Sequence, residues 1–391
     1  MKSGNGENGA YPPMRVLGFF AGVGGLELGL ERAGHETILL CENDPSASRV
    51  LDAQFPHVLD RRVDVRSRMS LPRDGDLLTA GFPCQDLSQA GRRQGFRGEQ
   101  SRLVNHVLSM LQRRRVPWVL LENVPFMLAL NAGSALREIL GKLERLGYHW
   151  AYRVVDTRAF GLPQRRERVF VVASIQGDPR NVLLADDAVP RVPRELNGSP
   201  AAMGFYWTEG NRGLGKGVEV VPTLKGSSGF SIPSPPAIWL PTGEIVTLDI
   251  RDAERLQGLP ANWTKTAEEV DRTSVRWRLV GNAVSVPVAR WIGRRLRRPG
   301  HYSSQQDREL GRDDRLPRAA WNVGTGAHAS SVTSWPVRYK LPTLRKFLRH
   351  PTKPLSARAT RGFTERLRRS YLRVPDGFLD ALDRHIARMQ E

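Results

Sequence analysis

The chain has 391 residues and a formal net charge of +19, because 59 lysines and arginines outnumber 40 acidic residues. This excess favours a polyanionic partner, and nucleic acid is the commonest. Two cysteines are too few for a disulfide framework or a cysteine-based zinc site, and no apolar run of about 18 residues predicts a transmembrane helix.

The first part of the chain predicts an α/β fold. Residues 1–13 are polar and lack the apolar core of a signal peptide, so we expect a disordered lead and a cytoplasmic protein. Short apolar runs then alternate with amphipathic segments. The expected strands are 16–20, 37–41, 77–80, 119–121, 152–155 and 168–173, and the expected helices are 26–32, 45–54, 101–114 and 134–146. Such alternation predicts a mostly parallel, doubly wound sheet.

The composition changes near Ser174. Residues 174–245 are rich in Gly, Pro and Ser, which predicts a small domain of irregular β structure. Helical patterns return at Asp252 and over 284–297. Residues 302–391 hold 18 lysines and arginines against 9 acids and end in an expected helix at 377–389. This last region is either an accessory module that contacts phosphates or an extension that packs on the first domain.

A glycine-rich turn at 20–25 (FAGVGG) joins the first expected strand to the first helix. Glycines allow a ligand to approach the backbone, and a helix N-terminus favours negative charge. Glu42 follows the second strand, where an acid can bind ribose hydroxyls. An ordinary turn with a surface glutamate gives the same pattern. A dinucleotide site is a further alternative, although the glycine order departs from G-x-G-x-x-G.

Cys84 stands in Pro-Cys-Gln after the strand 77–80, at the edge where parallel sheets hold reacting groups. The following loop, 89–101, is rich in Gly and Arg, as in a mobile lid that contacts phosphates. A buried cysteine is usually inert, and we interpret Cys41, inside an apolar strand, in that way. We interpret Cys84 as a nucleophile.

Two further motifs carry charge at strand ends. Glu122 opens Glu-Asn-Val after the strand 119–121, where a dry pocket would raise its pKa and let it hold a proton for a ring nitrogen. An exposed acid that caps the next helix is the alternative. In QRRER (164–168), Arg166 and Arg168 are expected to share one strand face and to hold a base edge, a phosphate or a carboxylate. A solvated basic edge strand is the alternative interpretation.

A further motif is Gly281-Asn282-Ala283-Val284, before the expected helix 284–297. Asn282 is expected to cap this helix.

These motifs, in this order over about 15–298, resemble the DNA (cytosine-5)-methyltransferase family. Pro-Cys-Gln, Glu-Asn-Val and Gln-x-Arg-x-Arg are jointly very specific. The resemblance implies a Rossmann-like domain that binds S-adenosylmethionine (AdoMet), a smaller and mostly irregular β target-recognition domain, and a basic C-terminal extension. The corresponding ranges are 14–173 completed by the helix 277–298, then 174–276 with a hinge, then 299–391.

The resemblance also implies a role for each residue that matches a family motif. Cys84 adds to carbon 6 of cytosine, Glu122 contacts N3 and the exocyclic amine, and Arg168, with Arg166 beside it, holds the flipped base. The implied cofactor-binding residues are Phe20, Gly22, Gly24, Glu42, Asn43, Asp64, Pro83, Asn282 and Ala283. The expected DNA contacts are Gln85, Ser88, Arg92, Arg93, Arg97 and Thr223, and no metal is expected. Thr223-Leu224 resembles the Thr-Leu pair that is common in the recognition domain of the family. Residues 255–258 resemble the segment that braces this domain.

The implied reaction is methylation of carbon 5 of cytosine in double-stranded DNA, with AdoMet as the cofactor. The base must leave the helix to be reached, and the cationic lid would close over it. A monomer is expected, with a restriction endonuclease for the same site as a companion enzyme. The alternatives are a tRNA cytosine-5 methyltransferase, whose Cys-Phe-Thr signature is missing, and a catalytically silent DNA-binding relative. A nicotinamide-dependent enzyme is the most remote.

Overall fold

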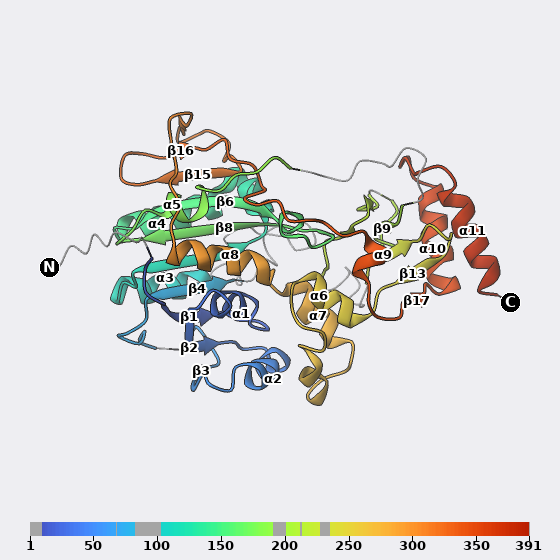
Figure 1. Ribbon diagram of the computed structural model, residues 1–391, viewed down its shortest axis with the longest axis horizontal. Coiled ribbons are helices and arrows are strands. Elements are labelled where there is room, and N and C mark those ends of the chain that lie inside the picture. Colours follow the sequence, from blue (N-terminus) through green and yellow to red (C-terminus); the bar gives the residue numbers. More distant parts are fainter. Residues whose placement is uncertain are drawn as a thin grey trace. The chain divides into compact units, whose positions relative to one another are not determined.

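The computed structural model describes residues 10–67, 69–82, 103–190, 201–211, 213–226 and 235–390 (Figure 1). The chain forms two compact units. Unit 1 comprises Met1–Ala159, Glu167–Pro190 and Val284–Arg338, and unit 2 comprises Phe160–Arg166, Arg191–Ala283 and Tyr339–Glu391. None of the helices among these described residues is long and apolar enough to cross a membrane.

Unit 1 contains a ten-stranded sheet in the order β14-β16-β15-β6-β8-β5-β4-β1-β2-β3. Its strands are β1 Arg15–Phe19, β2 Glu36–Cys41, β3 Asp60–Arg62, β4 Leu77–Gly81, β5 Trp118–Asn123, β6 His149–Asp156, β8 Glu167–Ser174, β14 Arg308–Glu309, β15 Ala319–Asn322 and β16 His328–Ala329. The run β3-β2-β1-β4-β5 is parallel, as predicted. β8 is antiparallel to β5 and β6, and β15 is antiparallel to β6. Since no crossover helix joins β6 to β8, β8 runs opposite to both of its neighbours, and β6 runs in the same direction as β5.

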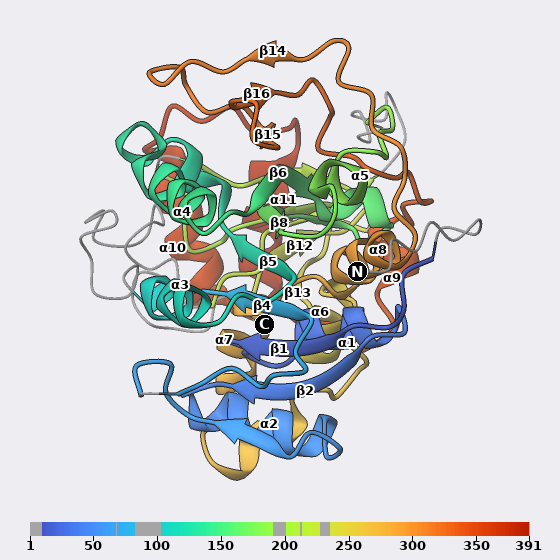
Figure 2. The same ribbon diagram turned by 90° about the vertical axis from the view of Figure 1, so that its left-hand side faces the viewer.

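Helices cover both faces of this sheet. They are α1 Gly25–Glu31, α2 Pro45–Gln54, α3 Leu103–Arg113, α4 Ser134–Arg145, α5 Pro179–Leu183 and α8 Val286–Arg297. Figure 2 shows α1, α5 and α8 on one face and α3 and α4 on the other. α3 buries Val104, Val107, Leu108 and Leu111, which recur at helical spacing, against the strands. The short turns η2 Pro125–Leu128, η3 Leu130–Gly133 and η4 Thr157–Phe160 connect these elements.

Unit 2 contains a smaller sheet in the order β10-β9-β12-β13-β17 and a parallel pair β11-β7. Its strands are β7 Gln164–Arg165, β9 Met203–Phe205, β10 Gly217–Val218, β11 Val221–Pro222, β12 Ala237–Trp239, β13 Ile245–Thr247 and β17 Lys353–Pro354. Its helices are α6 Ile250–Leu256, η5 Lys265–Glu269, α7 Val275–Asn282, α9 Leu344–Phe347, α10 Ala357–Arg368 and α11 Phe378–Arg388. The short strands agree with the irregular β structure predicted here.

The C-terminal region divides between the two units. In unit 1, β15 pairs with β6, and the buried Arg153 of β6 donates to Thr333 O (2.8 Å) and to Asp187 Oδ1 (2.7 Å). In unit 2, β17 pairs with β13. The compact units therefore follow other boundaries than the sequence-based ranges, and the roles predicted for those ranges stay predictions.

Candidate active site

The carboxyl ends of the parallel strands bring several predicted residues to one edge of the main sheet. β1 leads into the turn that begins at Phe20, and its neighbour β2 leads into Glu42. On the other side, β4 pairs with β5 so that Gly81 lies opposite Glu122. Because parallel strands end at a common edge, these positions come from four segments of the chain to one side of the sheet.

The turn after β1 and the carboxylate of Glu42 form a fixed cradle. Gly22 N donates to Glu42 Oε2 (2.7 Å), and Asp44 N donates to Oε1 (2.8 Å). Desolvation by burial raises the pKa of Glu42, and these two N–H groups oppose that shift. Phe20 has a φ of 52° and Gly22 a φ of 56°, and a Cβ on Gly22 would meet nothing within 4 Å. A non-glycine residue in the left-handed region is costly and often marks a ligand site.

Gly24, Asn43 and Asp64 have different surroundings. Gly24 has a φ of 78° and caps α1, and a Cβ there would collide with the Phe55 ring. The Asn43 side chain is exposed beside Glu42. The Asp64 carboxylate accepts from Arg66 Nη2 (2.7 Å), and this guanidinium lowers the pKa of Asp64. Asp64 is therefore held by a neighbour in the chain.

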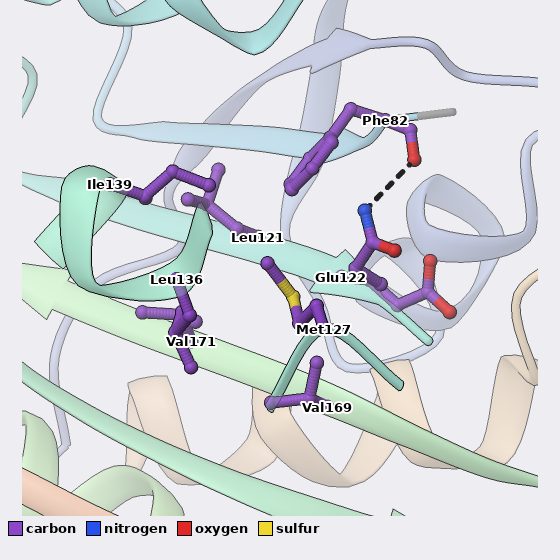
Figure 3. Close-up of a pocket in the computed structure, with 9 residues that line it drawn as sticks. Phe82, Leu121, Glu122, Met127, Leu136, Ile139, Val169 and Val171 are labelled. Atoms are coloured by element: carbon purple, nitrogen blue, oxygen red, sulfur yellow. Dashed lines mark hydrogen bonds between the residues drawn. The ribbon is translucent and has the colours of Figure 1, made fainter. Parts of the chain in front are cut away.

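Glu122 and Asn123 end β5 beside the last described residue of the β4 segment, Phe82. Asn123 Nδ2 donates to Phe82 O (3.2 Å), and Asn123 Oδ1 accepts from Val124 N (2.8 Å). Figure 3 shows the hydrogen bond to Phe82 O as a dashed line, with apolar side chains such as Met127 packed below it. Both polar residues are buried, with 7% of Glu122 and 3% of Asn123 exposed. The carbonyl two residues before Cys84 is thus fixed by a buried amide.

Arg168 forms an ion pair with Glu122. Arg168 Nε lies 3.1 Å from Glu122 Oε1. β8 runs antiparallel to β5, with Asn123 opposite Val169, so β8 begins at the edge where β5 ends. The structure thus pairs the strand-end acid with an arginine of the QRRER motif, a contact that the sequence did not predict. A carboxylate and a guanidinium side by side, largely shielded from water, can hold the polar edge of a base.

Arg166 does not share the position of Arg168, so the expectation of one guanidinium pair is wrong. Its side chain is 1% exposed and donates to three carbonyls of unit 2, Leu224 O (3.3 Å), Gly281 O (3.1 Å) and Ala283 O (2.7 Å). The strand is interrupted at this residue, because β7 ends at Arg165 and β8 begins at Glu167. The two-residue periodicity holds only along a continuous strand.

Thr223 and Leu224 form hydrogen bonds with the segment 164–165, directly before Arg166. Thr223 Oγ1 donates to Arg165 O (2.6 Å), and Leu224 N donates to Gln164 Oε1 (2.9 Å). Gln164 Nε2 in turn donates to Leu256 O (2.9 Å), and Gln257 Nε2 donates to Val280 O (2.8 Å). The resemblance of 255–258 to a bracing segment agrees with these contacts.

The expectation that Asn282 caps a helix is wrong. Asn282 is the last residue of α7, and α8 begins after Ser285, whose side chain makes no cap hydrogen bond. Ala283 lies between the two helices with an extended backbone, and its carbonyl is one of the three that accept from Arg166. The cofactor contacts expected of Asn282 and Ala283 stay predictions.

Several predicted residues lie outside the described part of the chain. They are Pro83, Cys84, Gln85, Ser88, Arg92, Arg93 and Arg97. The other cysteine, Cys41, lies in β2 with 2% of its surface exposed, and burial raises the pKa of its thiol to about 12. A thiol that stays protonated is a poor nucleophile, which agrees with an inert Cys41.

Comparison with known proteins identifies the family. The C-5 cytosine-specific DNA methylase family matches residues 14–199. Type II methyltransferase M2.BsuMI of Bacillus subtilis (strain 168) is 45% identical over 386 residues, which cover 95% of this chain and 98% of that protein. The chain belongs to the C-5 cytosine-specific DNA methylase family. The resemblance seen in the sequence and the predicted enzyme class are thereby confirmed.

More distant relatives agree with this assignment. Type II methyltransferase M.DsaV of Dactylococcopsis salina is 28% identical over 309 residues, covering 72% of this methyltransferase and 86% of the relative. Among solved structures, S. pombe Dnmt2 methyltransferase has a TM-score of 0.53 at 16% identity, and covers 72% of this chain and 98% of its own. Entamoeba histolytica methyltransferase EhMeth has the same TM-score at 14% identity, and covers 73% of this chain. These structural neighbours confirm the fold.

Some residues of this methyltransferase that shape the site were not singled out from the sequence. Asn123, Gln164 and Glu27 are buried polar side chains within or near the predicted motifs. Glu27 lies in α1 and accepts from Thr79 Oγ1 of β4 (3.0 Å). Asn123 and Gln164 stood inside quoted motifs, so their position was a usable signal. Glu27 gave none, because a glutamate in a helix is ordinarily solvated.

Proposed function

We propose that this methyltransferase transfers a methyl group from AdoMet to carbon 5 of cytosine within a specific double-stranded DNA sequence. The observation that carries the proposal is the largely buried Glu122–Arg168 ion pair at the end of β5. Glu122 lies opposite Gly81, which precedes Cys84 by three residues in the sequence. A flipped cytosine presents N3 and an amine on one edge, which a carboxylate and a guanidinium can recognise together.

The cradle after β1 supports AdoMet as the cofactor. Glu42, fixed by two backbone N–H groups, retains acceptor capacity for two ribose hydroxyls, and the open side of Gly22 leaves room for a ligand. AdoMet supplies an electrophilic methyl group when it is bound. The residues proposed to hold it are Phe20, Gly22, Gly24, Glu42, Asn43, Asp64, Pro83, Asn282 and Ala283.

Catalysis is proposed to begin with Cys84. Its thiolate forms a bond to carbon 6, while Glu122, protonated for this step, donates a hydrogen bond to N3, and the electron pair of the C5–C6 double bond makes carbon 5 nucleophilic. After carbon 5 is methylated, its proton leaves to a base and the Cys84–C6 bond breaks, which restores the ring and the thiolate. Arg168 orients Glu122 and the base, and the loop after Cys84 excludes water.

The DNA contacts and the biological setting are part of the proposal. Gln85, Ser88, Arg92, Arg93, Arg97 and Thr223 are proposed to contact DNA. The enzyme is proposed to be a cytoplasmic monomer and the modification enzyme of a restriction–modification system, with an endonuclease that cuts the same sequence. Similarity to Type II methyltransferases supports this setting.

The decisive experiment measures transfer of tritiated methyl from AdoMet to mixed-sequence duplex DNA, followed by bisulfite sequencing. We expect label on cytosine with wild type and none with Cys84→Ser, while Cys41→Ser, the matched control, keeps its activity. Labelled tRNA with unlabelled DNA would overturn the proposed substrate. AdoMet binding without transfer to either nucleic acid would indicate a catalytically silent relative.

A further inference from the structure

The C-terminal segment 339–390 is part of the fold of unit 2. β17 pairs with β13, and Leu355 N donates to Ile245 O (3.0 Å). Phe363 of α10 and Phe378 of α11 each lie with their ring centroids 5.1 Å from that of Phe205 of β9. Figure 1 shows α10 and α11 side by side against this sheet. The segment therefore has an apolar core in common with residues 203–247.

Buried polar contacts fix the same segment. Glu219 Oε1 accepts from Ala202 N (2.9 Å), and its Oε2 accepts from Leu344 N (2.6 Å). Arg366 of α10 donates to Trp207 O (2.8 Å) and to Glu209 O (2.9 Å). A helix held by both core packing and side-chain hydrogen bonds presents its outer face in a defined orientation.

The outer face of α10 is strongly cationic. Residues 339–373 hold eleven lysines and arginines against one acid, Glu365. α10 buries Thr360, Phe363, Thr364 and Leu367. Its exposed residues are Arg358, Arg361, Glu365, Arg368 and the C-cap Arg369, which recur at helical spacing and so share one face. We call Arg358, Arg361 and Arg369 the arginine stripe.

The arginine stripe has no acid partner within ion-pair distance among the described residues, whereas Arg368 pairs with Asp383 (2.5 Å). Its neighbour α11 is balanced, because Asp380 and Asp383 accompany Arg384 and Arg388. The charge excess of α10 is thus not shared by α11. Unpaired like charges on one helix face repel each other, and a polyanion that lies along the helix relieves that repulsion.

We propose that the arginine stripe binds the phosphate backbone of duplex DNA, outside the bases that the enzyme recognises. From Arg358 to the C-cap Arg369 the stripe covers twelve residues, and the eleven helical steps between its ends span about 16 Å. Over this length a duplex presents several phosphates. Guanidinium groups suit phosphate oxygens. The proposal rests on DNA being the substrate, and adds a binding surface that carries no sequence information.

The test compares two triple variants of the full-length enzyme. R358Q/R361Q/R369Q neutralises the stripe, and R145Q/R312Q/R315Q removes the same charge from three exposed arginines of unit 1. Fluorescence anisotropy gives the Kd for a mixed-sequence duplex against salt concentration. We expect the stripe variant to lower the magnitude of the log–log salt slope by about 2.7, at about 0.9 for each phosphate contact. The control should change it little.

A charge-preserving variant, R358K/R361K/R369K, should keep the wild-type slope. Equal slopes for wild type and the stripe variant, or an equal loss in both triples, would overturn the proposal. Loss of affinity for single-stranded RNA but not for duplex DNA would assign the surface to RNA instead. Methyl transfer measured at saturating DNA separates this proposal from the proposed function, because the stripe variant should keep the wild-type kcat.

Discussion

The carboxyl edge of the main sheet holds its side chains by different means from the cluster around Arg166. We call this cluster, in which Arg166 donates to Leu224 O, Gly281 O and Ala283 O, the brace. At the edge, strand register places Glu42, Glu122 and Arg168, of which Glu42 and Arg168 are partly exposed and Glu122 is buried. In the brace, Leu224, the end of α7 at Gly281 and the C-cap Ala283 are fixed by the buried side chain of Arg166, which donates to their carbonyls. The difference teaches that two arginines in one motif can have separate partners, a carboxylate for Arg168 and backbone carbonyls for Arg166.

Glu122→Gln should give the largest effect at the edge. The amide keeps the size and one acceptor but loses the negative charge that pairs with Arg168. We expect kcat to fall about 1000-fold, in the range that a positioned proton-transfer group contributes. The free energy of unfolding should fall by only about 1 to 2 kcal/mol, the difference between a charged and a neutral hydrogen bond. Steady-state kinetics and urea unfolding measure the two quantities.

The AdoMet affinity serves as the control for Glu122→Gln. Glu122 is not among the proposed cofactor residues, so isothermal titration should give a wild-type Kd. A kcat within tenfold of wild type would remove Glu122 from the proposed catalytic group and leave the ion pair with a structural role alone.

Arg166→Met should instead act on stability. The substitution leaves three buried carbonyls without their donor, at about 4 kcal/mol of unfolding free energy in total. Arg165→Met is the matched control, because that exposed side chain donates only to Lys216 O among described groups, and its loss should stay within about 0.5 kcal/mol. Urea unfolding gives the free energy of unfolding of both variants. Similar losses in Arg166→Met and Arg165→Met would show that the hydrogen bonds of Arg166 contribute no more to stability than those of an exposed arginine.

The strand ends were predictable because the signal is local. An apolar run followed by Glu42 or Glu122 gives both the strand and the polar residue at its end. The antiparallel direction of β8 was missed, because pairing direction depends on the connection between strands and not on their composition. Arg166 was misread because the break between β7 and β8 leaves no mark in a uniformly polar stretch.

The C-terminal region shows the same limit. Its excess of arginine was plain in the sequence, but its division between two sheets was not. β15 joins β6 across more than 160 residues of sequence, and β17 joins β13 across more than 100. Such pairings follow from long-range packing, and propensity does not encode them.

Glu27→Gln tests the protonation of a buried carboxyl group in α1. Desolvation raises the pKa of Glu27 from 4.5 to about 7, and Glu31 and Glu42 add to that shift. Between these pH values the folded protein holds a proton that the unfolded chain has lost, so wild-type stability falls as the pH rises. The cost above pH 7 is about 3 kcal/mol. Glutamine stays neutral, so its advantage over wild type should grow from near zero at pH 4.5 to this value at pH 8.

Denaturation of both proteins across this pH range gives the difference directly, because the other titrating groups cancel. Thr79→Val offers a comparison, since it removes the hydroxyl that donates to Glu27 without removing the acid. A difference between Glu27→Gln and wild type that did not vary with pH would mean that Glu27 is ionised in the folded state.

Asn123→Ala should give the smallest effect, divided between the free energy of unfolding and kcat. Phe82 O and Val124 N lose their side-chain partner, which costs about 1 to 2 kcal/mol of unfolding free energy. Because Phe82 lies two residues before Cys84, we expect a kcat about tenfold lower as well, since small displacements of a reacting group slow its reaction. The control is Asn105→Ala, because Asn105 is partly exposed and its side-chain Oδ1 accepts a hydrogen bond from Lys142 Nζ (2.6 Å). A kcat loss in Asn123→Ala without a change in AdoMet Kd would place the effect on the Cys84 segment, and a loss of both would place it on the whole edge of the sheet.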